Sequence, residues 1–256
     1  MAATSERAGS TKSSKPSTPP VVQDRDRDRL TWAGDFYRSG LGKKYVMAVT
    51  GIVLMGYVFA HMVGNLKLYQ GEAEINRYGE WLREIAYPAL PMEGALWGMR
   101  LILLAAFVLH IHAAYSLTRM NRRARPSGAK YQSKRDYIAA DFAGRTMRWS
   151  GVIVGLFVIF HLADLTFGTA NPDFTYGDVY GNMVASFSRP EVSAIYIVAN
   201  LALGLHLFHG AWSLFQTMGW NNRRFNHWRR NFAIGFAVVV VVGNVSFPIA
   251  VLAGIV

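Results

Sequence analysis

Cysteine is absent from the 256 residues of this chain, and charged residues are scarce. Without cysteine there can be no disulfide, and this chain alone can hold no Fe–S cluster or thiolate-ligated haem. Charged residues make up 17% of the sequence, whereas a soluble domain usually has about 25%. No Gly-rich dinucleotide turn follows a strand pattern, and residues 1–44 lack the apolar core of a cleavable signal peptide. These absences argue against a soluble dehydrogenase.

What the sequence has instead is long apolar runs. A transmembrane helix needs roughly 20 mostly apolar residues, and five segments reach that length, at about 45–66, 95–118, 149–168, 192–217 and 232–256. The predicted fold class is therefore an all-α membrane protein with five transmembrane helices. Residues 1–36, rich in Ser, Pro and Lys, are expected to form a disordered tail, and residues 37–256 the membrane domain.

The basic residues predict the orientation of these spans. Of the 27 Lys and Arg residues, 22 lie in the N-terminal 44 residues, in 119–148 or in 218–231, and the other five fall on the opposite side. Since Lys and Arg collect on the cytoplasmic side, we expect the N-terminus in the cytoplasm and the C-terminus outside, in a multi-pass protein of the cytoplasmic membrane. A nucleic-acid partner would not require this alternation and is not expected.

Two connections on the outer side differ in pattern. The connection 68–94 contains Glu80, Trp81, Arg83 and Glu84 before two prolines, which predicts a short amphipathic helix at the interface. The connection 169–190 contains Gly, Asn, Pro and Tyr and is expected to be a loop.

Six of the seven histidines fall within the predicted spans. Ionisable side chains inside a membrane are costly and mark functional sites by default. Given the expected orientation, His61 and His161 lie in the outer halves of spans one and three. His112 and His209 each lie 17 residues into spans two and four, in the inner halves. The histidines thus sort into an outer and an inner pair at matched depths, while the fifth span has none.

Paired imidazoles from facing helices at one depth are what a haem in a four-helix bundle core requires. On span two, His110 and His112 point about 160° apart, and on span four His206 is an alternative to His209. Gly210 would relieve crowding beside a flat macrocycle, which favours His209, and the depth match then favours His112. Another use of the histidines stays open: two imidazoles can hold one iron of a Rieske-type Fe–S centre whose thiolates come from a partner chain.

Two sequence blocks carry a family resemblance. The stretch SGLGKKYVMAVTG at 39–51, continuing to HMVGNL at 61–66, resembles the opening of the single-chain cytochrome b subunit of succinate dehydrogenase/fumarate reductase. The stretch HGAWSLFQTMGW at 209–220 resembles the fourth-helix signature of that family. The resemblance covers about residues 37–256. It implies axial haem ligands at His61, His161, His112 and His209, with one haem b for each pair.

The resemblance also implies partners and a second ligand. In that family the anchor binds a flavoprotein with FAD and an iron–sulfur protein, and electrons from succinate reach a membrane quinone, here expected to be menaquinone. Haem number varies in the wider family from two to none, and the whole complex can form an oligomer. The chain itself would hold no succinate site.

Quinone reduction needs a proton donor beside an apolar slot. The resemblance suggests an acidic residue just before the second helix, for which Glu84 and then Glu80 are the nearest. These carboxylates can equally be solvated residues of an amphipathic helix. Ser39 stands at the inner interface, where a quinone could also approach. Asp164, three residues after His161, either orients an imidazole, relays protons or is a wetted residue at a helix end.

Three interpretations are therefore carried forward. The first is the haem-bearing anchor subunit of a succinate:quinone oxidoreductase. The second is a haem-free anchor of the same complex with a His-ligated Fe–S centre shared with a partner. The third, from a different class, is a small transporter whose histidines relay protons; inverted repeats and broken helices, common in that class, are not evident.

Overall fold

The computed structural model describes residues 32–124, 138–220, 222, 224 and 226–256. The architecture is all-helical across these ranges. In chain order the elements are α1 (Trp32–Arg38), α2 (Gly40–Asn65), the 3-10 helix η1 (Leu66–Gln70), α3 (Glu72–Glu84), α4 (Gly94–Arg123), α5 (Ile138–Leu165), α6 (Val179–Phe187), α7 (Pro190–Thr217) and α8 (Asn226–Leu252).

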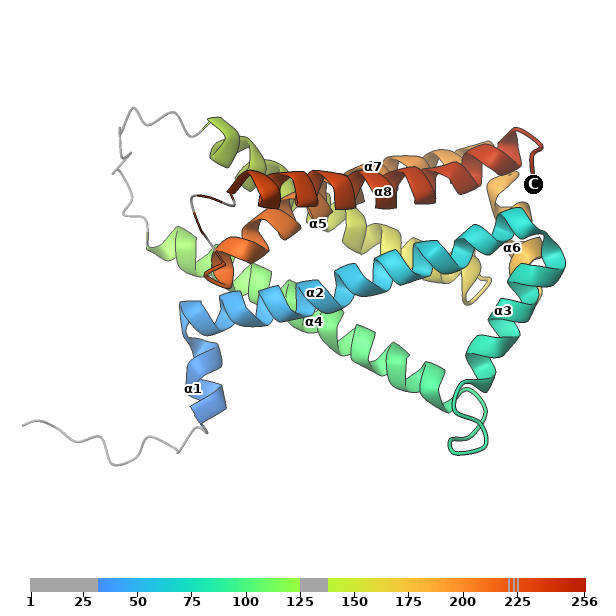
Figure 1. Cartoon of the computed structure of the whole chain (residues 1–256), viewed down its shortest axis with the longest axis horizontal. Helices are drawn as coiled ribbons and strands as arrows, with labels where there is room; N and C mark the ends of the chain where they lie inside the picture. The colour runs from blue at the N-terminus through green and yellow to red at the C-terminus, as the bar shows by residue number, and fades with distance from the viewer. Residues whose placement is uncertain (1–31, 125–137, 221, 223, 225) are drawn as a thin grey trace, which may run out of the picture.

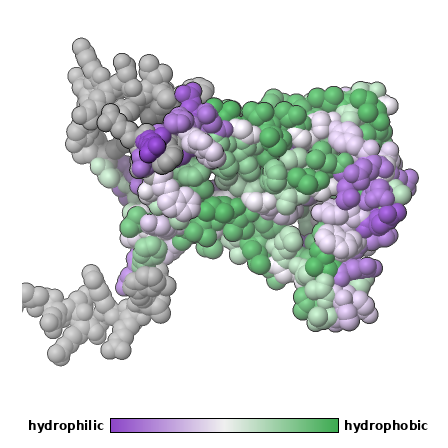
Figure 2. All heavy atoms as spheres, in the orientation of Figure 1, coloured by the Kyte–Doolittle hydropathy of each residue, from purple (hydrophilic) through white to green (hydrophobic). Residues whose placement is uncertain are grey.

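Five of these helices are long and apolar enough to cross a membrane, which confirms the predicted number. They are α2 continued by η1, α4, α5 from Thr146, α7 and α8. Figure 2 shows the same pattern on the surface, with an apolar band between two hydrophilic ends. The third and fifth helices end at Leu165 and Leu252, short of the predicted residues 168 and 256.

The long helices pack in pairs that run between two ends of the molecule (Figure 1). Helix α2 packs along α4, α5 along α7, and α8 along α7, whereas the two pairs α2–α4 and α5–α7 meet mainly through α2 and α7. One end, hereafter the α1 end, holds α1 and the last turns of α4 and α7. The opposite end, the α6 end, holds η1, α3, α6 and the C-terminus. Most of α2, α4 and α5 is not buried within the chain.

At the α1 end, a tight corner joins α1 to α2. Ser39 caps α2: its Oγ accepts a hydrogen bond from the Gly42 backbone N–H at 2.9 Å and donates to the Phe36 carbonyl at 2.7 Å. Lys43 donates to the carbonyls of Tyr37 and Arg38, at 3.0 and 2.9 Å, where the α1 dipole favours a cation. Helix α1 begins at Trp32, within the segment 1–36 that was predicted to be a tail, and residues 1–31 of that segment lie outside the described residues.

At the α6 end, two short helices cover the long ones. The connection 169–190 is not only loop, because α6 lies within it. Asp178 caps α6 by accepting from the Gly181 N–H at 2.9 Å, and it also accepts from the Asn76 amide of α3 at 3.0 Å. The amphipathic helix predicted around Glu80 exists as α3, but it begins at Glu72 and ends at Glu84.

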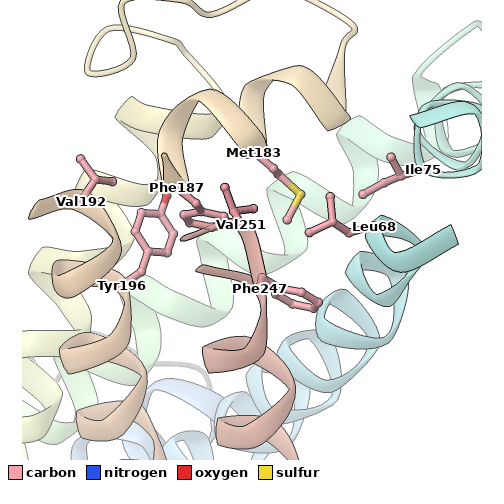
Figure 3. Close-up of a cluster of buried hydrophobic side chains, with 8 residues drawn as sticks. All are labelled: Leu68, Ile75, Met183, Phe187, Val192, Tyr196, Phe247 and Val251. Carbon is pink, nitrogen blue, oxygen red and sulfur yellow. The ribbon is translucent and has the colours of Figure 1, made fainter. Parts of the chain in front are cut away.

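A buried apolar cluster fixes this end of the fold (Figure 3). It joins η1, α3, α6, α7 and α8 through Leu68, Ile75, Met183, Phe187, Val192, Tyr196, Phe247 and Val251. Burial of one large apolar side chain contributes about 1.5–3 kcal/mol, so the cluster holds the short helices firmly against α7 and α8. Its one polar atom of consequence, the Tyr196 hydroxyl, belongs to the site described next.

Candidate functional site

The structure brings His61 of α2 and His161 of α5 into contact near the α6 end. Their ring centroids are 5.9 Å apart with an interplanar angle of 79°. Each ring also lies against an aromatic residue one turn earlier on its own helix. Tyr57 stacks on His61 at 5.4 Å, and Phe157 lies 5.8 Å from His161. This is the pair that the depth argument predicts for the outer side.

A second imidazole pair lies closer to the α1 end, between α4 and α7. The centroids of His110 and His206 are 6.3 Å apart, at an interplanar angle of 66°. Each ring packs close to a glycine of the neighbouring helix. A Cβ at Gly51 would lie 3.5 Å from Cε1 of His110, and one at Gly151 would lie 3.3 Å from Cε1 of His206. Larger residues at these glycines would press on the rings.

Hydroxyl groups determine which nitrogen of His110 and His206 carries the proton. Nδ1 of His110 is 3.1 Å from Thr50 Oγ1, and Nδ1 of His206 is 3.4 Å from Ser150 Oγ. Both hydroxyls already donate to backbone carbonyls, Thr50 to Val46 at 2.7 Å and Ser150 to Met147 at 3.1 Å. Each hydroxyl oxygen can therefore only accept from the imidazole, so Nδ1 is protonated and Nε2 keeps a free lone pair.

The favoured members of the inner pair, His112 and His209, are not brought together among the described residues. His112 is exposed, stacks on Tyr37 of α1 with centroids 5.8 Å apart, and shares a hydrogen bond with the Tyr37 hydroxyl. His209 is buried, with its Nε2 3.2 Å from Thr146 Oγ1. The facing imidazoles are thus the two alternates, His110 and His206. Ligation by any of the four stays a prediction.

An internal repeat relates the two halves of the bundle and was not recognised from the sequence, although its α4–α7 part aligns His112 with His209 and not the facing His110 with His206. Residues of α2 recur in α5 exactly 100 positions later with the same or similar type, as Met47/Met147, Thr50/Ser150, Gly51/Gly151, Tyr57/Phe157 and His61/His161. Likewise HAAYSL at 112–117 of α4 resembles HGAWSL at 209–214 of α7. The repeat is parallel, not inverted, because α2 and α5 both run towards the α6 end (Figure 1). Each half supplies one histidine to each pair.

The geometry of both pairs fits two imidazoles that share one metal ion. A His nitrogen–metal bond is about 2.0 Å, so opposed imidazoles have centroids about 6 Å apart. Among the described residues no group of three or more His, Asp or Glu side chains could hold a metal, and a haem needs only two axial ligands from the protein. His61 lies eleven positions after Thr50, and His161 eleven positions after Ser150. At 1.5 Å per residue the pairs are about 16 Å apart along the bundle.

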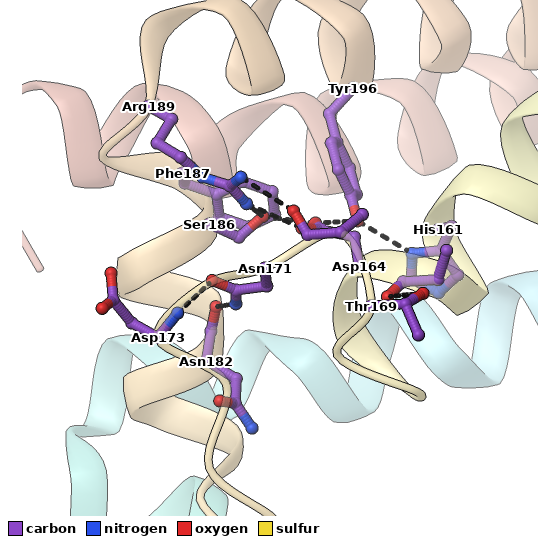
Figure 4. Close-up of polar contacts among 12 residues, drawn as sticks. His161, Asp164, Thr169, Asn171, Asp173, Asn182, Ser186, Phe187, Arg189 and Tyr196 are labelled. Carbon is purple, nitrogen blue, oxygen red and sulfur yellow. Dashed lines mark hydrogen bonds and ion pairs between the residues drawn. The ribbon is translucent and has the colours of Figure 1, made fainter.

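Asp164 is neither wetted nor in direct contact with an imidazole. Its side chain is fully buried and accepts from three donors (Figure 4). These are Arg189 at 2.7 Å, the Tyr196 hydroxyl at 2.9 Å and the Ser186 hydroxyl. The Tyr196 oxygen is in turn 3.3 Å from Nδ1 of His161. A buried charge is tolerated where it is paired and hydrogen-bonded in this way.

The residues expected at a quinone site are separated in the structure. Ser39 lies at the α1 end, where both hydrogen bonds of its hydroxyl serve the corner between α1 and α2. Glu80 and Glu84 are exposed on α3, at the opposite end. No hydrogen bond or ion pair of either carboxylate occurs within the described part of the chain. Their role in quinone binding stays a prediction.

Glu93 is an acidic residue that sequence reasoning overlooked, although it directly precedes α4. It has a left-handed backbone conformation, φ 61°, and accepts a hydrogen bond from the Tyr176 hydroxyl at 3.1 Å. Arg83 of α3 lies 3.8 Å from its carboxylate and over the Tyr176 ring at 5.3 Å. Glu93 and Arg83 each keep about a quarter of their side-chain surface exposed, 28% and 25%. We call these three residues the Glu93 corner.

No protein-family model, no curated protein and no solved structure matches this chain. The functional interpretation therefore rests on the residues and on their geometry.

Proposed function

We propose that this chain is the membrane-anchor subunit of a succinate:quinone oxidoreductase, which passes electrons from a flavoprotein and an iron–sulfur partner to a membrane quinone. The observation that carries the proposal is the two edge-on imidazole contacts, His61 with His161 and His110 with His206. Family resemblance at 39–66 and 209–220 supports it. The chain contributes no succinate site.

Two haem b groups fit the four facing histidines. Each would supply a one-electron carrier between its two imidazoles. Thr50 and Ser150 hold the rings of His110 and His206 with Nε2 unprotonated, the form that a metal ligand requires. Haems held by these two pairs would lie at two depths along the bundle and would supply one-electron chemistry at each depth.

The charge pattern favours docking of the soluble partners at the α1 end. The segments rich in Lys and Arg, 1–44, 119–148 and 218–231, precede or connect the long helices at that end. By the positive-inside rule this end faces the cytoplasm, where a flavoprotein and an iron–sulfur protein would reach it. A haem held by His110 and His206 would then lie nearer to these partners than one held by His61 and His161.

The Glu93 corner is the best-placed proton donor for a quinone. It lies at the end of the bundle that would face outwards, in the connection between α3 and α4. Its carboxylate is held by Arg83 and the Tyr176 hydroxyl, whereas Glu80 and Glu84 have no such fixed geometry. A positioned acid is what reduction of a quinone carbonyl needs. Menaquinone remains the expected quinone.

Copurification tests this function against its rivals. The full chain, tagged and expressed in its native host, is expected to bring down one FAD-containing protein and one Fe–S protein, and the complex should reduce a quinone analogue with succinate. A haem-free complex with this activity would support an anchor that shares an Fe–S centre with its partner. A chain isolated without any flavoprotein would favour the proton-relaying transporter.

A further inference from the structure

A chain of hydrogen bonds leads from the surface at the α6 end to one of the four facing histidines. It runs from Arg189 through Asp164 and Tyr196 to His161 (Figure 4). Tyr196 is 4% exposed and Asp164 is 0% exposed. The Tyr196 ring is wedged edge-on against Phe157 and Phe187, at centroid distances of 5.0 and 4.9 Å. Its hydroxyl therefore cannot move away from either partner without disturbing the buried cluster.

The directions of these hydrogen bonds follow from the donors available. Arg189 can only donate, so the Asp164 carboxylate accepts from it, as it does from the Ser186 and Tyr196 hydroxyls. The Tyr196 hydrogen therefore points to Asp164. The Tyr196 oxygen can then only accept from His161, which places a proton on Nδ1 of that imidazole. Nε2, at the far side of the ring, is left with a free lone pair.

We propose that Tyr196 and Asp164 are positioning residues that fix the tautomer of His161 and raise the basicity of its Nε2. This assignment rests on the proposed function, in which Nε2 of His161 is an axial haem ligand. A carboxylate that acts on a histidine ligand through a hydrogen bond makes the imidazole a stronger electron donor. A stronger donor stabilises the oxidised metal, so this chain of hydrogen bonds would lower the potential of a haem held by His61 and His161.

Among the described residues, a carboxylate acts through a tyrosine on only one of the two imidazole pairs, and in only one half of the repeat. The position equivalent to Asp164 in α2 is Gly64, against which the Tyr78 ring packs. At the other pair the acceptors are the neutral hydroxyls of Thr50 and Ser150, backed by backbone carbonyls. Removal of the Tyr196 hydroxyl should therefore alter one haem and leave the other unchanged.

Redox titration of the intact complex tests this assignment. Tyr196→Phe removes a single oxygen and keeps the aromatic packing. We expect it to favour the reduced form of one b haem about tenfold, a rise of about 59 mV for a one-electron couple, with no shift in the other haem. Asp164→Asn should shift the same haem in the same direction. Tyr180→Phe is the matched control, because Tyr180 packs on the same cluster without contacting a histidine; it should shift neither haem.

A second measurement separates failure of this assignment from failure of the proposed function. In the full chain labelled with ¹⁵N-histidine, the His161 imidazole should carry its proton on Nδ1 in the haem-free protein, and Tyr196→Phe should lose this preference. If the wild-type protein contained no haem and no flavoprotein copurified with it, the proposed function would fail while the tautomer could still be read. The assignment would be overturned if the His161 imidazole of the wild-type protein were protonated on Nε2. It would also be overturned if neither haem potential shifted in Tyr196→Phe.

Discussion

Replacing His206 with leucine is expected to lower the haem content of the purified complex from two b haems to one. His206 faces His110 at a centroid distance of 6.3 Å, and its Nδ1 lies against Ser150, so its Nε2 is the free ligand. Leucine is close in size but has no ligand atom. Electron transfer from succinate to quinone should fall by at least about 100-fold, since changes even to outer-shell partners of a metal ligand typically cost 10–100-fold.

The neighbouring histidine provides the control. His209→Leu changes a residue three positions later on the same helix, whose Nε2 is already 3.2 Å from Thr146 Oγ1. It should keep both haems. On α4, His110→Leu should lose one haem and His112→Leu should keep both, because His112 is exposed and hydrogen-bonded to Tyr37. The opposite result would be that His209→Leu loses a haem and His206→Leu keeps both. It would show that His209, the residue chosen from the sequence, is the ligand and that His206 is not.

Glu93→Gln is expected to reduce the rate of quinone reduction by about 100-fold, while both haems are still reduced by succinate. General acid–base catalysis by a positioned side chain typically contributes 10²–10⁴-fold. Glutamine keeps the size of the side chain and can still accept from the Tyr176 hydroxyl. The measurement is succinate:quinone activity, compared with succinate oxidation by a soluble dye that accepts electrons from the partner subunits.

Glu80→Gln and Glu84→Gln are the matched controls for this prediction. Both residues lie on α3, close in sequence to Arg83 of the Glu93 corner. Neither carboxylate has a hydrogen-bond or ion-pair partner among the described residues. We expect them to retain nearly full activity. If Glu84→Gln abolished quinone reduction while Glu93→Gln did not, the proton donor would be the residue that family resemblance suggests, and the Glu93 corner would have only a structural role.

The five spans were predictable because membrane crossing depends on length and apolarity, which can be read directly from the sequence. The short helix α6 was not. Its nine residues lie in a connection whose Gly, Asn and Pro suggest a loop, and its stability comes from burial of Met183 and Phe187 in the cluster at the α6 end. The available signal was Asp178 before an apolar run, the usual pattern of an N-cap.

Depth along a helix predicted the contact between His61 and His161 but could not choose among the inner histidines. His110 and His112 differ by only about 3 Å along the axis, and the choice depends on rotation of α4 about that axis. Rotation is set by packing of α4 on α2, which places His110 against Thr50 and Gly51. The 100-residue repeat relates Thr50 to Ser150, which lie beside the facing rings, but its α4–α7 part aligns His112 with His209 and therefore did not indicate His110.

The polar partners at the α6 end could not be inferred from spacing alone. Asp164 acts through Tyr196, which lies 32 residues away on another helix, and Glu93 meets Tyr176 across 83 residues. Such pairings depend on how α5, α6 and α7 converge. Only the three-residue spacing between His161 and Asp164 indicated that a carboxylate is near the outer imidazole.

The central claim is that four facing histidines of this chain hold two haems, and haem content tests it most directly. The intact complex would be purified through the tagged chain, and a pyridine haemochrome assay and a dithionite-reduced minus oxidised spectrum recorded on the same sample. We predict two b haems per anchor chain. A complex with full succinate:quinone activity and no haem would contradict the claim.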